Sequence, residues 1–116
     1  MRPDLGDAAY LRDMLTAATL VRDFVAGRTL EQYKADVFLR SAVERQVEII
    51  GEAARRISDP FRAAHPHVPW RPIIAQRHIL AHEYGEIDDP LVWRVATVHV
   101  PALIPLLEAM LPPPPQ

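Results

Sequence analysis

The 116-residue chain has no cysteine, which excludes a disulfide scaffold, a thiolate metal site and a catalytic thiol. It has little excess charge, with a formal net value of −2, which argues against a protein that coats nucleic acid by bulk electrostatics. No apolar run follows the charged N-terminal residues, so no signal peptide is predicted. The longest apolar stretch is interrupted by His99, Pro101 and Pro105 and is expected to be too short to span a bilayer. These absences favour a cytoplasmic, reducing location and no membrane partner.

What the chain does contain is enough apolar sequence for one domain. Hydrophobic residues make up 49% of the composition, which lets a chain of this length bury a core with a modest margin. The run of prolines 112–115 cannot pack as a helix and is expected to fray. We therefore predict one domain over residues 1–111 and a disordered, proline-rich tail over 112–116.

The spacing of the apolar residues is helical almost throughout, and no segment alternates with period two over a useful length. A first helix is predicted over residues 5–26, where Asp4 and Asp7 resemble an N-cap pair and Gly27 suits the C-terminal stop. Its apolar stripe consists of Leu11, Met14, Leu15, Ala18, Val21 and Val25.

A second helix is predicted over residues 34–57, after a capping-box pattern formed by Thr29 and Gln32. This helix has two apolar stripes, which indicates either one face on the domain and one on a partner, or a central place in its own bundle. The first stripe is Leu39, Val43, Val47, Ile50, Ala54 and Ile57, and the second is Phe38, Ala42, Ile49 and Ala53.

Four prolines make residues 58–72 a broken connector. A third long helix is predicted over 70–84, and Asp88 or Asp89 is expected to cap a last one. Prolines in this last helix predict a kink or split near residues 99–105. The fold class is all-α: a single-domain bundle of about four to five helices.

The small net charge conceals a basic segment. Residues 53–82 hold five arginines and one acid, a formal charge of +4, so the remainder of the chain carries −6. Four of the five histidines lie in the same segment. This clustering is what points to a local site for an anion.

The densest polar chemistry lies within residues 76–84. On an ideal α-helix, His78 and His82 nearly superimpose, as do Arg77 and Tyr84. Arg77 and His82 would be about 140° apart around such a helix, and their long side chains could converge on a phosphodiester.

Arginine and histidine together suit phosphodiester chemistry. The guanidinium fork of Arg77 matches phosphate oxygens, and His82 can move a proton near neutral pH. Without a metal, this pair could cleave RNA by using the substrate's own 2′-hydroxyl as nucleophile. From the residues alone, a solvated polar helix face and a zinc site at His78 and His82 remain alternatives. The absence of cysteine and the position of Glu83, on neither histidine's face, argue against zinc.

The remaining histidines and the two tryptophans are expected to have structural roles. His65 and His67 lie among prolines and are expected in a loop, and His99 beside Pro101 is expected to be partly buried. Trp70 and Trp93 are expected to brace the polar helix rather than to stack on bases.

The run from Arg77 to Tyr84 resembles the R-x4-H-x-Y signature of the HEPN superfamily, specifically its HepT-like toxins. The upstream segment 49–58 also resembles that family's second helix, as do Pro69-Trp70 before the motif and Asp88-Asp89-Pro90 with Trp93 after it. The resemblance covers nearly the whole chain in order and spacing.

The resemblance implies a HEPN-like helical bundle that forms a homodimer, in which two motifs face one cleft. It implies a metal-independent endoribonuclease with Arg77 and His82 as catalytic residues and without a cofactor. His78 stands where many members carry asparagine, and it joins Arg71 and Arg55 as secondary candidates for phosphate or RNA contact.

The same resemblance implies the toxin of a type VII-like toxin–antitoxin module. The antitoxin would be an MntA-type minimal nucleotidyltransferase that transfers AMP from ATP to Tyr84. The added phosphate would occupy the place of the RNA backbone and repel it. Two other classes of function remain open: a non-catalytic nucleotide- or substrate-binding module of such a transferase, and a structural dimerisation domain.

Overall fold

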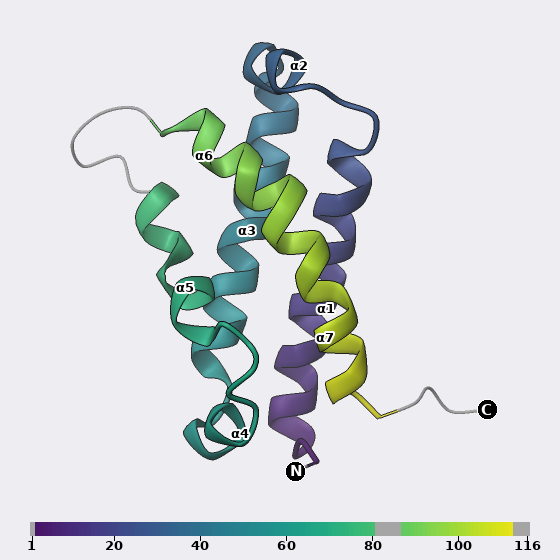
Figure 1. The fold of residues 1–116 in the computed structure, drawn as a ribbon, viewed down its shortest axis with the longest axis vertical. Coiled ribbons are helices and arrows are strands. Elements are labelled where there is room, and N and C mark those ends of the chain that lie inside the picture. Colours follow the sequence, from purple (N-terminus) through teal and green to yellow (C-terminus); the bar gives the residue numbers. More distant parts are fainter. Residues whose placement is uncertain (1, 81–86, 113–116) are drawn as a thin grey trace.

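The computed structural model describes residues 2–80 and 87–112, and within these ranges every regular element is a helix (Figure 1). The all-α prediction is therefore confirmed. In chain order the elements are α1 (Leu5–Val25), α2 (Leu30–Ala35), α3 (Val37–Arg56), α4 (Asp59–Ala64), α5 (Trp70–Ala75), the 3₁₀ helix η1 (Gln76–Leu80), α6 (Asp89–Arg94), the π-helical turn η2 (Val95–His99) and α7 (Val100–Met110).

The helix α1 packs against α3 and against α7 (Figure 1). Its ends match the sequence prediction, because the Asp4 carboxylate accepts a hydrogen bond from the Asp7 backbone N–H at 2.6 Å. Gly27 follows the helix with a φ of +72°, a conformation that glycine adopts without a Cβ penalty. The predicted stripe faces the core, where Leu11, Met14, Ala18, Val21 and Val25 are buried.

A polar link joins the beginning of α1 to the α3–α4 junction. The carboxylate of Asp7 is buried, and it accepts hydrogen bonds from the Ser58 backbone N–H at 2.8 Å and the Ser58 hydroxyl at 2.7 Å. Ser58 is also the N-cap of α4, where its hydroxyl accepts from Phe61 N–H. One carboxylate therefore fixes the turn from which α4 departs.

The second predicted helix is two helices rather than one. The capping box of Thr29 and Gln32 is present, but α2 begins directly after it and ends at Ala35. Asp36 is extended, and its carboxylate caps a new helix by accepting a hydrogen bond from Leu39 N–H at 3.1 Å. The prediction over 34–57 missed this break because an aspartate that caps a helix also occurs within helices.

The two stripes of α3 differ in burial. All residues of the first stripe are buried, as the pattern predicts. Along the second stripe burial increases toward the C-terminus: Phe38 is 85% exposed, Ala42 and Ile49 are half-buried, and Ala53 is buried. Only the N-terminal part of the second stripe is therefore open on this chain.

The third predicted helix is not a continuous α-helix. The α-helical part is α5, and the chain continues from Gln76 as the 3₁₀ helix η1. No residue of η1 is fully buried, although Ile79 and Leu80 pack against the core. Because a 3₁₀ helix has about three residues per turn, the angles predicted on an ideal α-helix do not apply to Arg77 and His78. His82 and Tyr84 lie outside the described residues.

The irregularity of the last helix lies N-terminal to the predicted position. A π-helical turn, η2, precedes the prolines, and the Val100 N–H bonds the Val95 carbonyl. Pro101 then occupies the first turn of α7, and Pro105 lies inside the helix without ending it. The wider turn accommodates the missing Pro101 donor before the helix resumes.

The α6–η2–α7 segment therefore runs without a break from Asp89 to Met110. By length and composition this segment could cross a membrane, so the prediction that the apolar stretch is too short was wrong. A core helix passes the same test, and this segment packs against α1 with Val92, Val100 and Leu107 fully buried.

Candidate functional site

The polar segment is positioned by a close approach of α5 to α3. Gly51 lies within α3, and a Cβ atom there would be 3.1 Å from the Ile73 carbonyl oxygen and 3.8 Å from that of Ile74. Both oxygens belong to the α5 backbone, which cannot move aside as a flexible side chain can. Gly51 therefore allows α5, and η1 after it, to lie directly on α3.

We expect Gly51→Val to displace α5 and to lower the free energy of unfolding by about 1–3 kcal/mol, since the added atoms overpack this contact. Urea unfolding measures the effect. The control is Ala42→Val, a substitution on the half-buried second stripe of the same helix. Equal stability of the two variants would contradict the tight contact.

A groove of about 500 Å³ lies beside α5 and η1. Its walls come from α4, α5 and η1 and carry three arginines and a histidine. The lining residues are Arg62, Ala63, Trp70, Arg71, Ile74, Ala75, Arg77 and His78. The fold thus brings three of the predicted contacts, Arg71, Arg77 and His78, to one surface.

The charge in this groove is largely uncompensated. Arg62 pairs with Asp59 within α4. Arg71 and Arg77 are exposed, and neither forms an ion pair with the residues that the structure describes. An anion that enters the groove could therefore bind two guanidinium groups without first breaking an ion pair.

Arg55 lies outside this groove, on the last turn of α3. Its Nε donates to the Glu52 carboxylate at 3.2 Å, and the Arg56 Nε is 3.8 Å from the same oxygen. The hydrogen bond from Arg55 lowers the pKa of Glu52 most, and the positive charges of Arg55, Arg56 and Arg77 lower it further. Arg55 on α3 and Arg77 on η1 therefore both lower the pKa of the Glu52 carboxyl group.

The two tryptophans have different roles. Trp70 is buried at the start of α5, where its indole N–H donates to the His65 carbonyl at 3.0 Å, so it braces the polar segment as predicted. Trp93 instead packs on Tyr33, with ring centroids 5.3 Å apart, and braces α2 against α6. His65 caps α4 and stacks on Phe61, and His67 follows it in the connector.

No group of three or more metal-binding side chains gathers within the described ranges 2–80 and 87–112. Because His82 and Tyr84 lie outside these ranges, the structure places only the arginine of the predicted catalytic pair.

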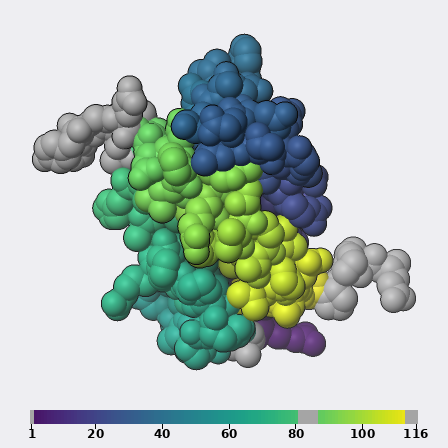
Figure 2. Space-filling model, turned by 45° about the horizontal axis from the view of Figure 1, so that its top comes forward, coloured from purple at the N-terminus to yellow at the C-terminus, as the bar shows by residue number. Residues whose placement is uncertain are grey.

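Sequence reasoning missed a second hollow on the opposite side of α5 and η1. It is an apolar cavity of about 500 Å³ between this segment and the η2–α7 stretch, and Gln76 and His99 are its polar residues. Figure 2 shows the teal surface around α4 and α5 beside the yellow-green surface of α7. The prediction that His99 is partly buried was wrong, because His99 is exposed at the end of η2, where it lines this cavity.

A signal for this cavity exists in the sequence. Pro69, Ile73, Gln76 and Ile79 recur at spacings of three and four, so they form one helical row containing a single polar residue.

The structure defines a small helical protein whose groove carries two arginines, Arg71 and Arg77, without an ion pair among the described residues, a surface suited to an anionic ligand. Comparison with known proteins gives the family. The model of the family described as "Ribonuclease HepT-like" matches residues 14–110, and the chain belongs to this family. The predicted resemblance is confirmed, and so is the predicted enzyme class, an endoribonuclease.

Individual relatives agree with this assignment. A Methanocaldococcus jannaschii protein whose name describes it as an RNase is 38% identical over 82% of this chain and 87% of its own length. A Thermococcus cleftensis protein named as a ribonuclease HepT is 34% identical over 81% and 86%. A Caldanaerobacter subterraneus protein, also named as an RNase, is 33% identical over 81% and 84%. No solved structure matches the chain.

Proposed function

We propose that this ribonuclease is a metal-independent endoribonuclease and the toxin of a toxin–antitoxin module in the cytoplasm. The observation that carries the proposal is the exposed Arg77, in a cationic groove within a chain of the ribonuclease HepT-like family. The arginine is held on a segment packed directly against α3, so its position is set by the fold rather than by a free loop.

In the proposed reaction the 2′-hydroxyl of one nucleotide attacks the adjacent phosphorus atom. His82 moves the proton, as base for the attacking hydroxyl or as acid for the leaving 5′-oxygen. Arg77 stabilises the additional negative charge of the pentavalent state. The phosphate–5′-oxygen bond breaks, and the products are a 2′,3′-cyclic phosphate and a 5′-hydroxyl. Such chemistry is specific for RNA, since DNA has no 2′-hydroxyl.

The test is RNA cleavage by purified protein in excess EDTA. We expect cleavage to persist, the products to carry 2′,3′-cyclic phosphate ends, and DNA of the same sequence to remain intact. His82→Ala should abolish cleavage, and His67→Ala, in the connector, serves as its matched control. Cleavage that requires a metal, or that survives in His82→Ala, would contradict the mechanism. An inactive wild-type protein that still binds a nucleotidyltransferase would favour a non-catalytic partner module.

We further propose that the active form is a homodimer and that Tyr84 is the acceptor of AMP from a minimal nucleotidyltransferase of the MntA type. Two copies of the basic segment facing one cleft would double the charge available to RNA. The open part of the second stripe, around Phe38, offers apolar surface for such an assembly.

Coexpression with the cognate transferase should add mass in steps of one AMP and reduce RNA cleavage, because the new phosphate occupies the anion site. Tyr84→Phe should prevent both effects, whereas Tyr10→Phe on α1 should leave them unchanged. Intact-protein and peptide mass spectrometry provides the measurement. An adduct on another residue would refute the assignment to Tyr84.

A further inference from the structure

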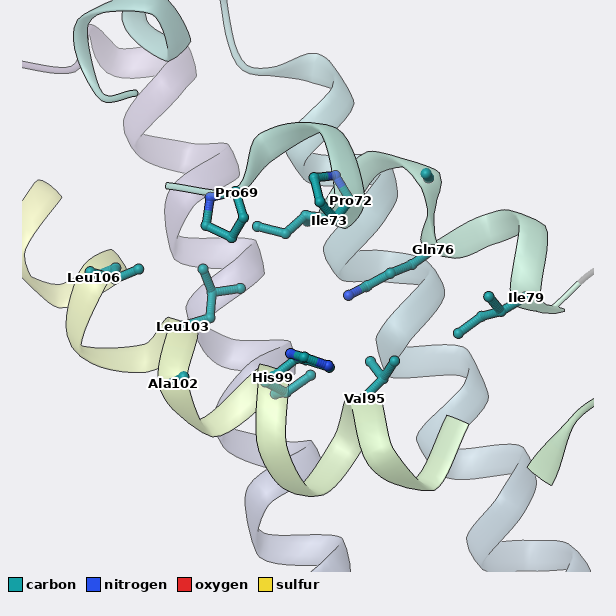
Figure 3. Close-up of a pocket in the computed structure, with 12 residues that line it drawn as sticks. Pro69, Pro72, Ile73, Gln76, Ile79, Val95, His99, Ala102, Leu103 and Leu106 are labelled. Atoms are coloured by element: carbon teal, nitrogen blue, oxygen red, sulfur yellow. The ribbon is translucent and has the colours of Figure 1, made fainter. Parts of the chain in front are cut away.

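The apolar cavity is enclosed by two separate parts of the chain. Pro69, Pro72 and Ile73 come from the α5 side, and Leu103 and Leu106 come from α7 (Figure 3). With a volume of about 500 Å³ it has room for a group as large as a purine nucleoside. Its apolar walls are suited to the faces of a flat ring.

Gln76 supplies hydrogen-bonding groups to this cavity. Its side chain extends from η1 toward the space above His99, with the amide nitrogen at its end (Figure 3). The amide oxygen is buried, and no described residue donates a hydrogen bond to it. A buried acceptor without a donor costs free energy, and a ligand with a donor would remove that cost. The last torsion of glutamine is soft, so a small rotation brings both amide atoms to the same ligand edge.

The cavity and the cationic groove share one wall. Ala75 lines both hollows, while its neighbours divide between them: Gln76 lines the cavity and Arg77 lines the groove. At this point the wall between the two hollows carries only the methyl group of the exposed Ala75. A nucleotide chain whose phosphate meets Arg77 can therefore place a base over this wall and beside Gln76.

Resting on the proposed function, we propose that this cavity binds a base of the RNA substrate and that Gln76 selects adenine. A glutamine amide matches the N6 donor and N7 acceptor of adenine with two hydrogen bonds. The apolar walls provide the contacts that unstacked bases of single-stranded RNA require. Gln76 is therefore a specificity-determining residue, separate from the groups that act on phosphorus.

The first experiment measures binding of 5′-AMP, 5′-GMP, 5′-CMP and 5′-UMP to the full chain by NMR titration. We expect 5′-AMP to bind about ten-fold more tightly than the others, which is the size of discrimination one paired amide contact gives. Gln76→Leu should remove the preference, whereas Gln46→Leu on α3 should retain it. Equal binding of the four nucleotides by the wild type would overturn the proposal, as would an unchanged preference in Gln76→Leu.

The second experiment maps the positions at which RNA is cleaved. It tests whether the cavity recognises adenine within RNA or only in a free nucleotide. We expect wild-type cuts to be enriched next to adenine, and Gln76→Leu to cut at a similar total rate with the enrichment lost. Unchanged positions in Gln76→Leu would overturn the proposal even if free 5′-AMP binds. An inactive wild type would contradict the proposed function instead, and the nucleotide titration would then decide the site alone.

A third variant tests whether the cavity itself is used. Ala102→Trp should fill it from the exposed side of α7, weakening 5′-AMP binding at least ten-fold, and Ala109→Trp is the matched control on the same helix. Sedimentation of both variants accompanies the titration. If Ala102→Trp alone changes the oligomeric state, the cavity is a contact between copies of the chain, and the proposal is overturned.

Discussion

Replacing Arg77 by alanine is expected to lower the rate of RNA cleavage by about 100-fold or more while leaving the fold intact. The loss follows from the position of the guanidinium group in a groove, where it forms no ion pair with a described carboxylate. Removal of a single group that stabilises charge in the transition state has effects of this size. Because Arg77 is exposed on η1, its truncation should change the free energy of unfolding by less than about 0.5 kcal/mol. Single-turnover cleavage and urea unfolding measure the two quantities.

Two further arginine variants serve as comparisons for Arg77→Ala. Arg71→Ala removes a second cation from the groove and should weaken RNA binding mainly at low salt, by about ten-fold or less. Arg12→Ala removes an exposed cation from α1 and should have no effect on cleavage. If Arg77→Ala behaves like Arg12→Ala, the cationic groove is not the active site.

Replacing Asp7 by alanine is expected to lower the free energy of unfolding by about 2–4 kcal/mol, because a buried carboxylate with two hydrogen bonds is lost. The Ser58 N–H would remain partly buried without its acceptor. For a domain of this size the melting temperature should fall by about 10 °C or more. Thermal and urea unfolding provide the measurement.

The matched control is Asp13→Ala, which removes an exposed carboxylate from the same helix. Asp7→Asn should be intermediate, since the amide retains one acceptor oxygen. In a double-mutant cycle with Ser58→Ala, the losses should be clearly less than additive, since both substitutions break the same contact. Additive losses would show that Asp7 acts through something other than Ser58.

The sequence correctly predicted the helices whose apolar stripe packs into the core. The stripe of α1 and the first stripe of α3 are core in the structure, because spacings of three and four place side chains on one face. The break at Asp36 was missed because it depends on the conformation of this single residue, which caps α3 in an extended conformation instead of continuing a helix. The kink or split predicted near residues 99–105 is instead a π-helical turn that precedes Pro101, because a proline disrupts the hydrogen bond to the turn before it.

For the site, composition and motif spacing predicted a polar segment whose described part lines a groove, but they did not predict the geometry of that segment. Arg71, Arg77 and His78 do share a groove, as their clustering indicates. The turn that carries Arg77 and His78 is a 3₁₀ helix, so α-helical angles do not describe it, and the predicted relations to His82 and Tyr84 lie outside the described residues. The cavity lined by Gln76 was missed because the sequence shows only the row of residues on the α5 side, and the other half of the wall comes from α7, which lies far along the chain.

The division of side chains along α5 and η1 has a consequence for how the sequence can change. Neighbouring residues serve different sides of this segment, with Gln76 on one and Arg77 on the other. Deleting one residue between Ile73 and Gln76 would rotate everything after it by roughly 100° and bring Arg77 into the register of Gln76, which lines the cavity. Replacing a single residue alters one hollow, whereas this change in length alters the groove and the cavity at once. The spacing of this segment should therefore resist deletion.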